Sequence, residues 1–315
     1  MGINMEDITD KKFTVNHINY ALVEETRPPM YTALKYWGKK PHNIWRKFIE
    51  SYCPEDGIVL DPFAGCAMSA FETVLANRKS FCFDLNPITS FIIEVYTSEF
   101  NEYEFRKEFQ RIKKIILSDP IYQQHFLRLY NNESSLVYNY RWKDGMVDEV
   151  CLETQSGKRH RIDSEEIDLV NADSMQTIHI PFWFPIDKFP NNPSITHKFI
   201  KDIGGETFDF LWTKRNLYLL SLIFDEILNV ENQAVKIQLL FGFIQTLHLT
   251  FKMVVPRSKS SNRDFSGSWG RADYMVRRKS MEQNPLIIFE RSCLTKQSVV
   301  SSLKDAQKKL KGKKL

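Results

Sequence analysis

Two short acidic segments carry the residue types that a nucleotide-type cofactor site requires. Residues 61–65 read DPFAG, and residues 84–87, which begin 23 positions after Asp61, read DLNP. A tight loop at the C-terminal end of a strand places a ligand against backbone N–H groups at the start of the next helix. A carboxylate at the end of the neighbouring strand, here Asp84, can accept hydrogen bonds from both hydroxyls of a ribose. The two segments therefore predict a site for a cofactor that contains a ribose.

The elements around these segments form a predicted βαβ unit. Residues 58–60 are an apolar run typical of a buried parallel strand, residues 66–76 favour a helix, and residues 80–83 favour a second strand. A preceding helix is predicted over 41–53 from its apolar spacing. The loop lacks the GxGxxG pattern, since Pro62 and Phe63 stand where a dinucleotide fold has glycine, which disfavours NAD and FAD.

The same segments resemble the cofactor half of the amino-group DNA methyltransferases. These enzymes use S-adenosylmethionine to methylate adenine N6 or cytosine N4. Residues 36–43 (YWGKKPHN) resemble the segment that they place just before the cofactor strand. Softer similarity to a bacterial subgroup with an insertion after the second strand continues at residues 182–185, 213–218, 284–285 and 289–291. The resemblance spans about residues 28–315 and implies an α/β, Rossmann-like class I methyltransferase fold, incomplete in this chain, with a mixed α/β insertion.

The resemblance also implies a set of cofactor-binding residues. Asp61, Phe63 and Gly65 would shape the loop, and Asp84 would hold the ribose. The full set is Tyr36, Lys40, Asp61, Pro62, Phe63, Ala64, Gly65, Asp84, Leu85 and Asn86. One departure from the family pattern is Ala67, which replaces a glycine. Its Cβ is tolerable if the backbone φ angle there is negative.

The catalytic tetrapeptide of the family is missing. It consists of Asp, Asn or Ser, then Pro-Pro, then an aromatic residue that stacks on a flipped base. The only Pro-Pro here is Pro28-Pro29, between Arg27 and Met30, and we interpret it as a rigid part of an N-terminal arm. We therefore assign no catalytic residue. The resemblance implies a second methyltransferase subunit that carries an Asp-Pro-Pro-Tyr-like motif, or else truncation of a longer gene product.

Positive charge is concentrated towards the C-terminus. Residues 252–315 contain sixteen Lys or Arg and five Asp or Glu, so the remaining 251 residues carry a net charge of −7 within a total of +4. Lys and Arg interleaved with Ser and aromatic residues over 252–279 favour contact with double-stranded DNA, against the alternative of a solvated basic loop. The candidate DNA-binding residues are Arg257, Lys259, Arg263, Arg271, Arg277 and Arg278.

The remaining features exclude several classes of protein. Five cysteines without a CxxC pair argue against a disulfide scaffold and a thiolate zinc site, and favour a reducing, cytoplasmic compartment. The histidines show no ligand spacing, so no metal is expected. The N-terminus does not read as a signal peptide, and the apolar stretch 237–251 is too short to span a membrane.

We expect three regions along the chain. Residues 1–130 would form the arm and the cofactor-binding α/β part, 131–205 a small β-rich insertion with about three strands over 136–162, and 206–315 a helical and basic region. The predicted function is that of a cofactor-binding subunit or fragment of a bacterial DNA methyltransferase, of the kind found in restriction-modification or defence systems. The alternatives are a non-catalytic DNA-binding or regulatory subunit with a degenerate cofactor site, and an RNA methyltransferase.

Overall fold

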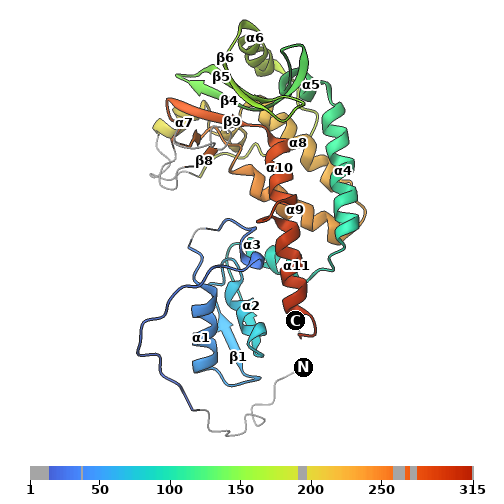
Figure 1. The fold of residues 1–315 in the computed structure, drawn as a ribbon. Coiled ribbons are helices and arrows are strands. Elements are labelled where there is room, and N and C mark those ends of the chain that lie inside the picture. Colours follow the sequence, from blue (N-terminus) through green and yellow to red (C-terminus); the bar gives the residue numbers. More distant parts are fainter. Residues whose placement is uncertain (1–13, 37, 191–196, 258–266, 270–274, 314–315) are drawn as a thin grey trace. The chain divides into compact units, whose positions relative to one another are not determined.

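The computed structural model describes residues 14–36, 38–190, 197–257, 267–269 and 275–313 (Figure 1). Contacts divide the chain into two compact units, one formed by residues 1–99 with 302–315 and the other by residues 100–301. The described part is a mixed α/β protein whose larger sheet is antiparallel. The predicted boundaries at 130 and 205 both fall inside the second unit, and the functional division into three regions stays a prediction.

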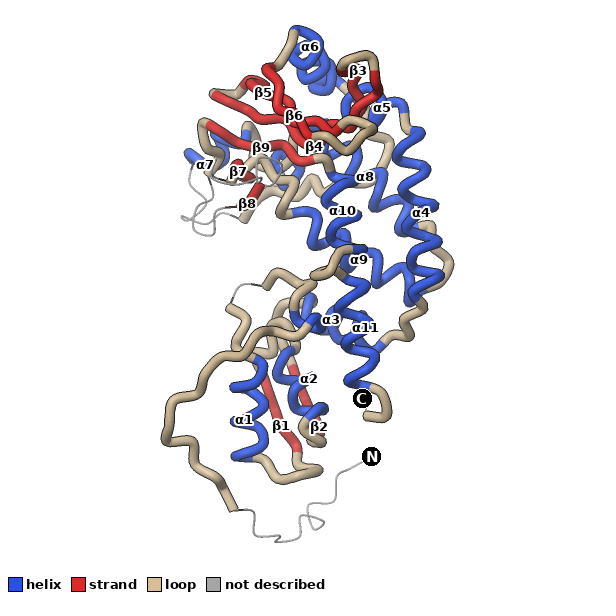
Figure 2. Tube along the Cα trace, in the orientation of Figure 1, coloured by secondary structure: helices blue, strands red, loops and turns tan. Residues whose placement is uncertain are grey.

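The first unit contains the predicted βαβ motif. Strands β1 and β2 are parallel, and Leu60 lies opposite Phe81 in their register (Figure 2). Helix α2 connects the strands and packs against both of them, and α1 packs on α2. The elements are α1 (His42–Tyr52), β1 (Ile58–Asp61), α2 (Met68–Leu75), β2 (Lys79–Cys82) and α3 (Ile88–Thr97).

The prediction that the first strand is buried is wrong. Ile58 and Leu60 on β1 are 55% and 63% exposed, and Phe81 and Phe83 on and after β2 are 51% and 60% exposed. In a strand, alternate residues point to opposite faces. One face of the pair contacts α2, and the apolar side chains on the opposite face are left open to solvent.

The N-terminal arm is fixed at Met30. Its amide donates to the Asp305 carboxylate at 3.0 Å, and its carbonyl accepts from the hydroxyls of Tyr96 at 2.6 Å and Ser302 at 2.9 Å. Ser302 and Asp305 lie on α11 (Val299–Leu310), and Met30 lies in the short 3₁₀ helix η2 (Pro29–Tyr31). In the described structure, the Pro-Pro segment thus leads into a structural anchor.

The larger sheet belongs to the second unit. Its strands are β3 (Leu127–Tyr130), β4 (Glu133–Lys143), β5 (Met146–Glu153), β6 (Arg159–Asp163) and β9 (Lys279–Gln283), in the order β3-β4-β5-β6 with β9 also paired to β4. The predicted meander over 136–162 is confirmed as β4 to β6. Its turns are centred on Asp144-Gly145 and Ser156-Gly157, where positive φ angles suit Asp and Gly. Strand β9 joins from far along the chain, which the sequence analysis did not anticipate.

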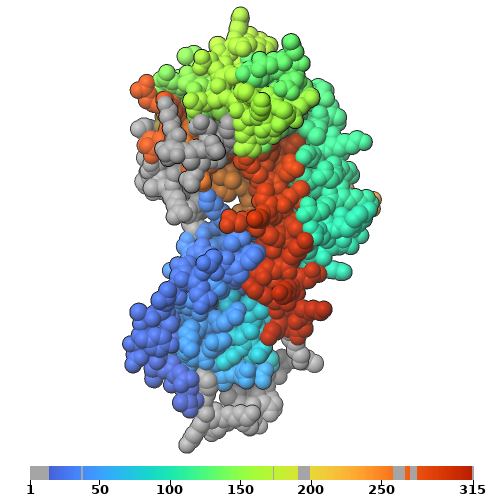
Figure 3. Space-filling model, viewed as in Figure 1, coloured from blue at the N-terminus to red at the C-terminus, as the bar shows by residue number. Residues whose placement is uncertain are grey.

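Helices pack beside this sheet and supply most of the core. They are α4 (Glu102–Ser118), α5 (Pro120–Phe126), α6 (Glu166–Ser174), α7 (His197–Ile203), α8 (Lys214–Leu228), α9 (Gln233–Leu247) and α10 (Pro285–Leu294), with the short strands β7 (Val254–Pro256) and β8 (Gly267–Trp269). Phe109, Phe241 and Phe289 are completely buried where α4, α9 and α10 meet. The space-filling view shows the region of β4 to β6 and α6 as one continuous surface (Figure 3).

Two predicted segments differ in detail. Residues 88–130 favour helix by sequence, but the structure divides them into α3, α4 and α5 and places residues 127–130 in strand β3. Helix α5 begins separately because Asp119 caps it and Pro120 occupies its first position. Residues 180–205, rich in Pro, Phe, Trp and Asn, favour an ordered loop by sequence. The described part contains no helix from residue 180 to residue 190, and α7 occupies the end of the segment. Among the described residues, no helix is both long and apolar enough to cross a membrane.

A buried ion pair connects α8, β4 and β9. Arg215 donates to the Glu282 carboxylate at 2.9 and 2.7 Å, and both side chains are 2% exposed. Glu282 also accepts from the Thr213 hydroxyl at 2.6 Å and from the indole N–H of Trp142 at 2.9 Å. Burial alone would raise the pKa of Glu282, but the Arg215 charge and these donors lower it. This carboxylate is therefore charged inside the unit.

The open face of β1 and β2 gives a first testable prediction. Phe81→Ser should change the free energy of unfolding by no more than about 0.5 kcal/mol, because exposed side chains contribute little. Phe71→Ser, on the covered side, is the matched control: Phe71 is 3% exposed and packs against Tyr96, so its loss should cost about 3–5 kcal/mol. Urea denaturation measures both. Equal large losses would mean that the chain itself covers Phe81.

Candidate cofactor site and basic surface

The loop between β1 and α2 is fixed by the Asp61 carboxylate. Asp61 accepts from the amide of Phe63 at 2.9 Å and from the hydroxyl of Ser69 in α2. The amide of Ala64 donates to the carbonyl of Phe83 at 2.9 Å, which continues the pairing of the two strands beyond their ends. The Asp61 carboxylate thus makes its hydrogen bonds within the protein, and these bonds shape the loop in the way that a turn-capping residue does.

Asp84 joins the two predicted segments. Its carboxylate accepts from the amide of Gly65 at 2.7 Å and from the amide of Asn86 at 2.8 Å. These backbone donors hold the pKa of Asp84 below its usual value, so the group is ionised at neutral pH. The Asn86 side chain in turn accepts from the amide of Ile88 at 3.0 Å, where α3 begins. A charged carboxylate therefore lies beside the loop, as the ribose hypothesis requires.

Gly65 is the one loop position that needs a glycine. Its φ angle is +53°, and a Cβ built there would lie 3.0 Å from the hydroxyl oxygen of Tyr36. The carbonyl of Gly65 accepts from the buried Thr89 hydroxyl at 2.6 Å. Burial and the nearby Asp84 charge raise the pKa of Tyr36. Tyr36, from the upstream segment, thus lies directly against the loop.

The condition of a negative φ at Ala67 is not met. Ala67 has a φ of +57° and is completely buried just before α2 begins at Met68. A left-handed conformation costs a non-glycine residue about 1–2 kcal/mol, and Ala67 adopts it. The methyl group is accommodated by the fold itself.

Lys39 is a residue that the sequence analysis did not select. Its ammonium group donates to the carbonyls of Tyr31, at 2.6 Å, and Leu34. Burial lowers its pKa to about 8. Lys40, which was selected, is exposed. Sequence alone could not separate two adjacent lysines, because the fold decides which of them turns inward.

The remaining selected residues form an open apolar border. Phe63, two residues before Gly65, is 86% exposed, and Leu85, directly after Asp84, is fully exposed. Pro62 is also exposed, whereas Ala64 is buried. An ionised carboxylate flanked by exposed apolar side chains can hold the two ends of a nucleoside, with hydroxyls on the charge and a base against the apolar groups.

The predicted DNA-binding residues fall into two groups. Lys259, Arg263 and Arg271 lie outside the described residues. Arg257 and Arg277 are exposed. Arg278 is 85% exposed and forms a two-point contact with Asp144 at 2.6 and 2.9 Å, so part of its charge is already balanced within the protein.

Comparison with known proteins gives no relatives: no protein-family model, curated protein or solved structure matches the chain. Within the described ranges, no group of three or more His, Cys, Asp or Glu side chains could hold a metal ion. The functional assignment therefore depends on the local chemistry of the loop and on the resemblance of its motifs.

Proposed function

We propose that this chain is the S-adenosylmethionine-binding part of a DNA methyltransferase that modifies an exocyclic amino group, adenine N6 or cytosine N4. The observation that carries the proposal is the contact of the ionised Asp84 carboxylate with the amide of Gly65 at 2.7 Å. It brings the two family-like segments into one site at the ends of parallel strands. That is where Rossmann-like folds bind nucleotide cofactors, and we assign the unit to this class.

Different residues of the site would contact different parts of the cofactor. Asp84 would accept hydrogen bonds from the ribose, Phe63 and Leu85 would flank the base, and Tyr36 would border the loop near Gly65. The cofactor, when bound, supplies the methyl group. Asp61 would act as a positioning residue, because its contacts with Phe63 and Ser69 hold the loop that leads into α2.

A second polypeptide would complete the enzyme. The sequence contains no Asp-Pro-Pro-Tyr-like motif, and two parallel strands are too few for a stable doubly wound sheet. Parallel sheets are normally covered on both faces, whereas Ile58, Leu60 and Phe81 are exposed. This open apolar face supports a partner that adds strands and a covering helix. We place the assembled protein in the cytoplasm, with duplex DNA as its substrate.

Isothermal titration calorimetry with S-adenosylmethionine tests the cofactor assignment. The wild-type chain should bind, and Asp84→Ala should weaken binding by at least about tenfold, because a hydrogen bond to a charged group contributes about 1.5–3 kcal/mol. Glu50→Ala, an exposed acid on α1, is the control and should bind normally. Absence of heat from the wild-type chain, with and without its partner, would contradict the proposal and favour the non-catalytic DNA-binding subunit.

The nucleic acid substrate is tested separately. Competition between duplex DNA and duplex RNA of the same sequence should favour DNA. A preference for RNA would support an RNA methyltransferase, which shares the same cofactor unit.

A further inference from the structure

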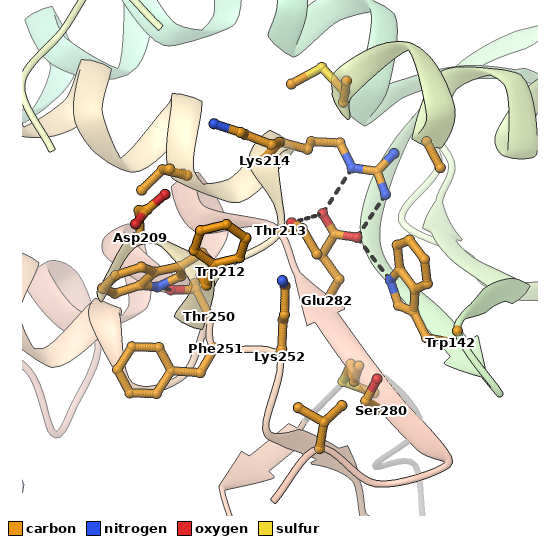
Figure 4. A pocket seen from close by; sticks show the side chains of 18 of the residues that line it. Trp142, Asp209, Trp212, Thr213, Lys214, Thr250, Phe251, Lys252, Ser280 and Glu282 are labelled. Atoms are coloured by element: carbon orange, nitrogen blue, oxygen red, sulfur yellow. Dashed lines mark hydrogen bonds and ion pairs between the residues drawn. The ribbon is translucent and has the colours of Figure 1, made fainter. Parts of the chain in front are cut away.

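A pocket of about 290 Å³ lies within the second unit, and none of its lining residues belongs to the predicted cofactor site (Figure 4). It is bordered by the end of β4, the segment from 209 to the start of α8, residues 250–252 after α9, and β9. Small-molecule sites usually have volumes of about 300–1,000 Å³. This pocket is at the lower end, which suits one planar ring system better than an extended ligand.

Aromatic side chains form one side of the pocket. Trp212 and Phe251 have ring centroids 4.9 Å apart at an angle of 58°. The indole N–H of Trp212 donates to the Thr250 hydroxyl at 3.1 Å, which fixes the orientation of that ring. Phe210 also lines the pocket and is 36% exposed. Fixed aromatic rings beside an open volume can stack on a planar ligand.

Two lysines belong to the lining of the same pocket. Lys252 donates to the carbonyl of Ile203 at 2.8 Å and lies 5.8 Å from the centre of the Phe210 ring. Burial lowers the pKa of Lys252. Figure 4 shows its amino group between the Trp212 side and Glu282. Lys214 lies 5.7 Å from the Phe184 ring, and the exposed Arg277 also belongs to the lining.

The polar groups of the lining offer both donors and acceptors. The Glu282 carboxylate already accepts from Arg215, Thr213 and Trp142, so it is occupied. One terminal guanidinium nitrogen of Arg215 is buried and has no partner among the described residues. Asp209, also in the lining, accepts from the Thr207 hydroxyl at 2.5 Å and retains further acceptor capacity. Such a combination suits a ring that carries hydrogen-bonding edges.

We propose that this pocket binds one unpaired nucleobase, with its phosphate near Lys214 and Arg277. Recognition of unstacked bases combines aromatic stacking with hydrogen bonds to the base edges and cationic contacts to phosphate, and all three elements meet here. The inference shares its nucleic acid partner with the proposed function but does not require S-adenosylmethionine. None of the residues that line the pocket belongs to the predicted cofactor loop.

Binding of 2-aminopurine tests the proposal, because stacking on aromatic rings quenches the fluorescence of this base. Two probes are titrated into the full chain without S-adenosylmethionine: a 12-nucleotide single strand with one central 2-aminopurine, and 2-aminopurine riboside monophosphate. We expect saturable quenching, weakened at least about tenfold by Lys214→Ala and by Phe210→Leu. Lys107→Ala, an exposed lysine on α4 away from the pocket, should leave the binding unchanged.

The two probes distinguish the source of the base. Tighter binding of the strand identifies a base within a nucleic acid, and equal binding identifies a free nucleotide; either result supports the pocket. Absence of quenching by the folded wild-type chain, or equal binding by both pocket variants and Lys107→Ala, would overturn it. Circular dichroism confirms that each variant is folded. Because no S-adenosylmethionine is present, failure here and failure of the cofactor titration are separate results.

Discussion

Replacing Glu282 by alanine should destabilise the second unit by about 3–5 kcal/mol, because it leaves the Arg215 charge buried without its partner. Both side chains are 2% exposed, so water cannot replace the lost contacts. The hydroxyl of Thr213 and the indole N–H of Trp142 lose their acceptor in the same substitution. The free energy of unfolding, measured in urea and followed by amide exchange in β4 and β9, gives the magnitude.

The matched control is the exposed pair of Arg278 and Asp144. Its geometry is as good, with distances of 2.6 and 2.9 Å, but its side chains are 85% and 42% exposed. Arg278→Ala should therefore have little effect on stability, since solvent screens exposed pairs. Similar losses for the two variants would show that the Glu282 pair is not buried in solution.

Acid should destabilise the second unit through His125, the other prediction with a large effect. His125 is 1% exposed, and burial, reinforced by the nearby Arg215 charge and opposed by Glu282, lowers its pKa to about 4. The unfolded chain, with an ordinary histidine pKa of about 6.5, binds the proton first as the pH falls. The contribution to stability is therefore complete above about pH 6.5 and declines towards pH 4, by about 3 kcal/mol in total.

The substitution His125→Phe isolates this effect. It keeps an aromatic ring in the site between α5 and the sheet but removes the titrating group. The unfolding free energy of this variant should fall less steeply between pH 6.5 and pH 4 than that of the wild-type chain. Identical pH profiles would show that burial does not lower the pKa of His125 in the folded state.

The largest difference between expectation and structure concerns burial of the first strand. Its apolar residues Ile58 and Leu60 predicted a strand, and they form one, because β-branched and apolar residues favour extended backbone. Whether a strand is buried depends on what covers it, and that is a property of other elements. The same limit applies at Ala67, where side-chain type alone could not show that the surrounding loop imposes a positive φ.

The local elements of this protein can be predicted from its amino-acid sequence. The βαβ order around 58–83 and the meander over 136–162 both follow from short-range spacing and turn residues. Local preference suffices there because the hydrogen bonds that define each element join nearby residues.

Long-range packing selects which distant residues meet. It paired β9 with β4, buried Arg215 against Glu282 and turned Lys39 rather than Lys40 inward. It also gathered Trp142, Trp212 and Lys252 around one pocket. These contacts join residues that are far apart in the chain, and packing of the whole unit, rather than the preference of any single segment, selects them.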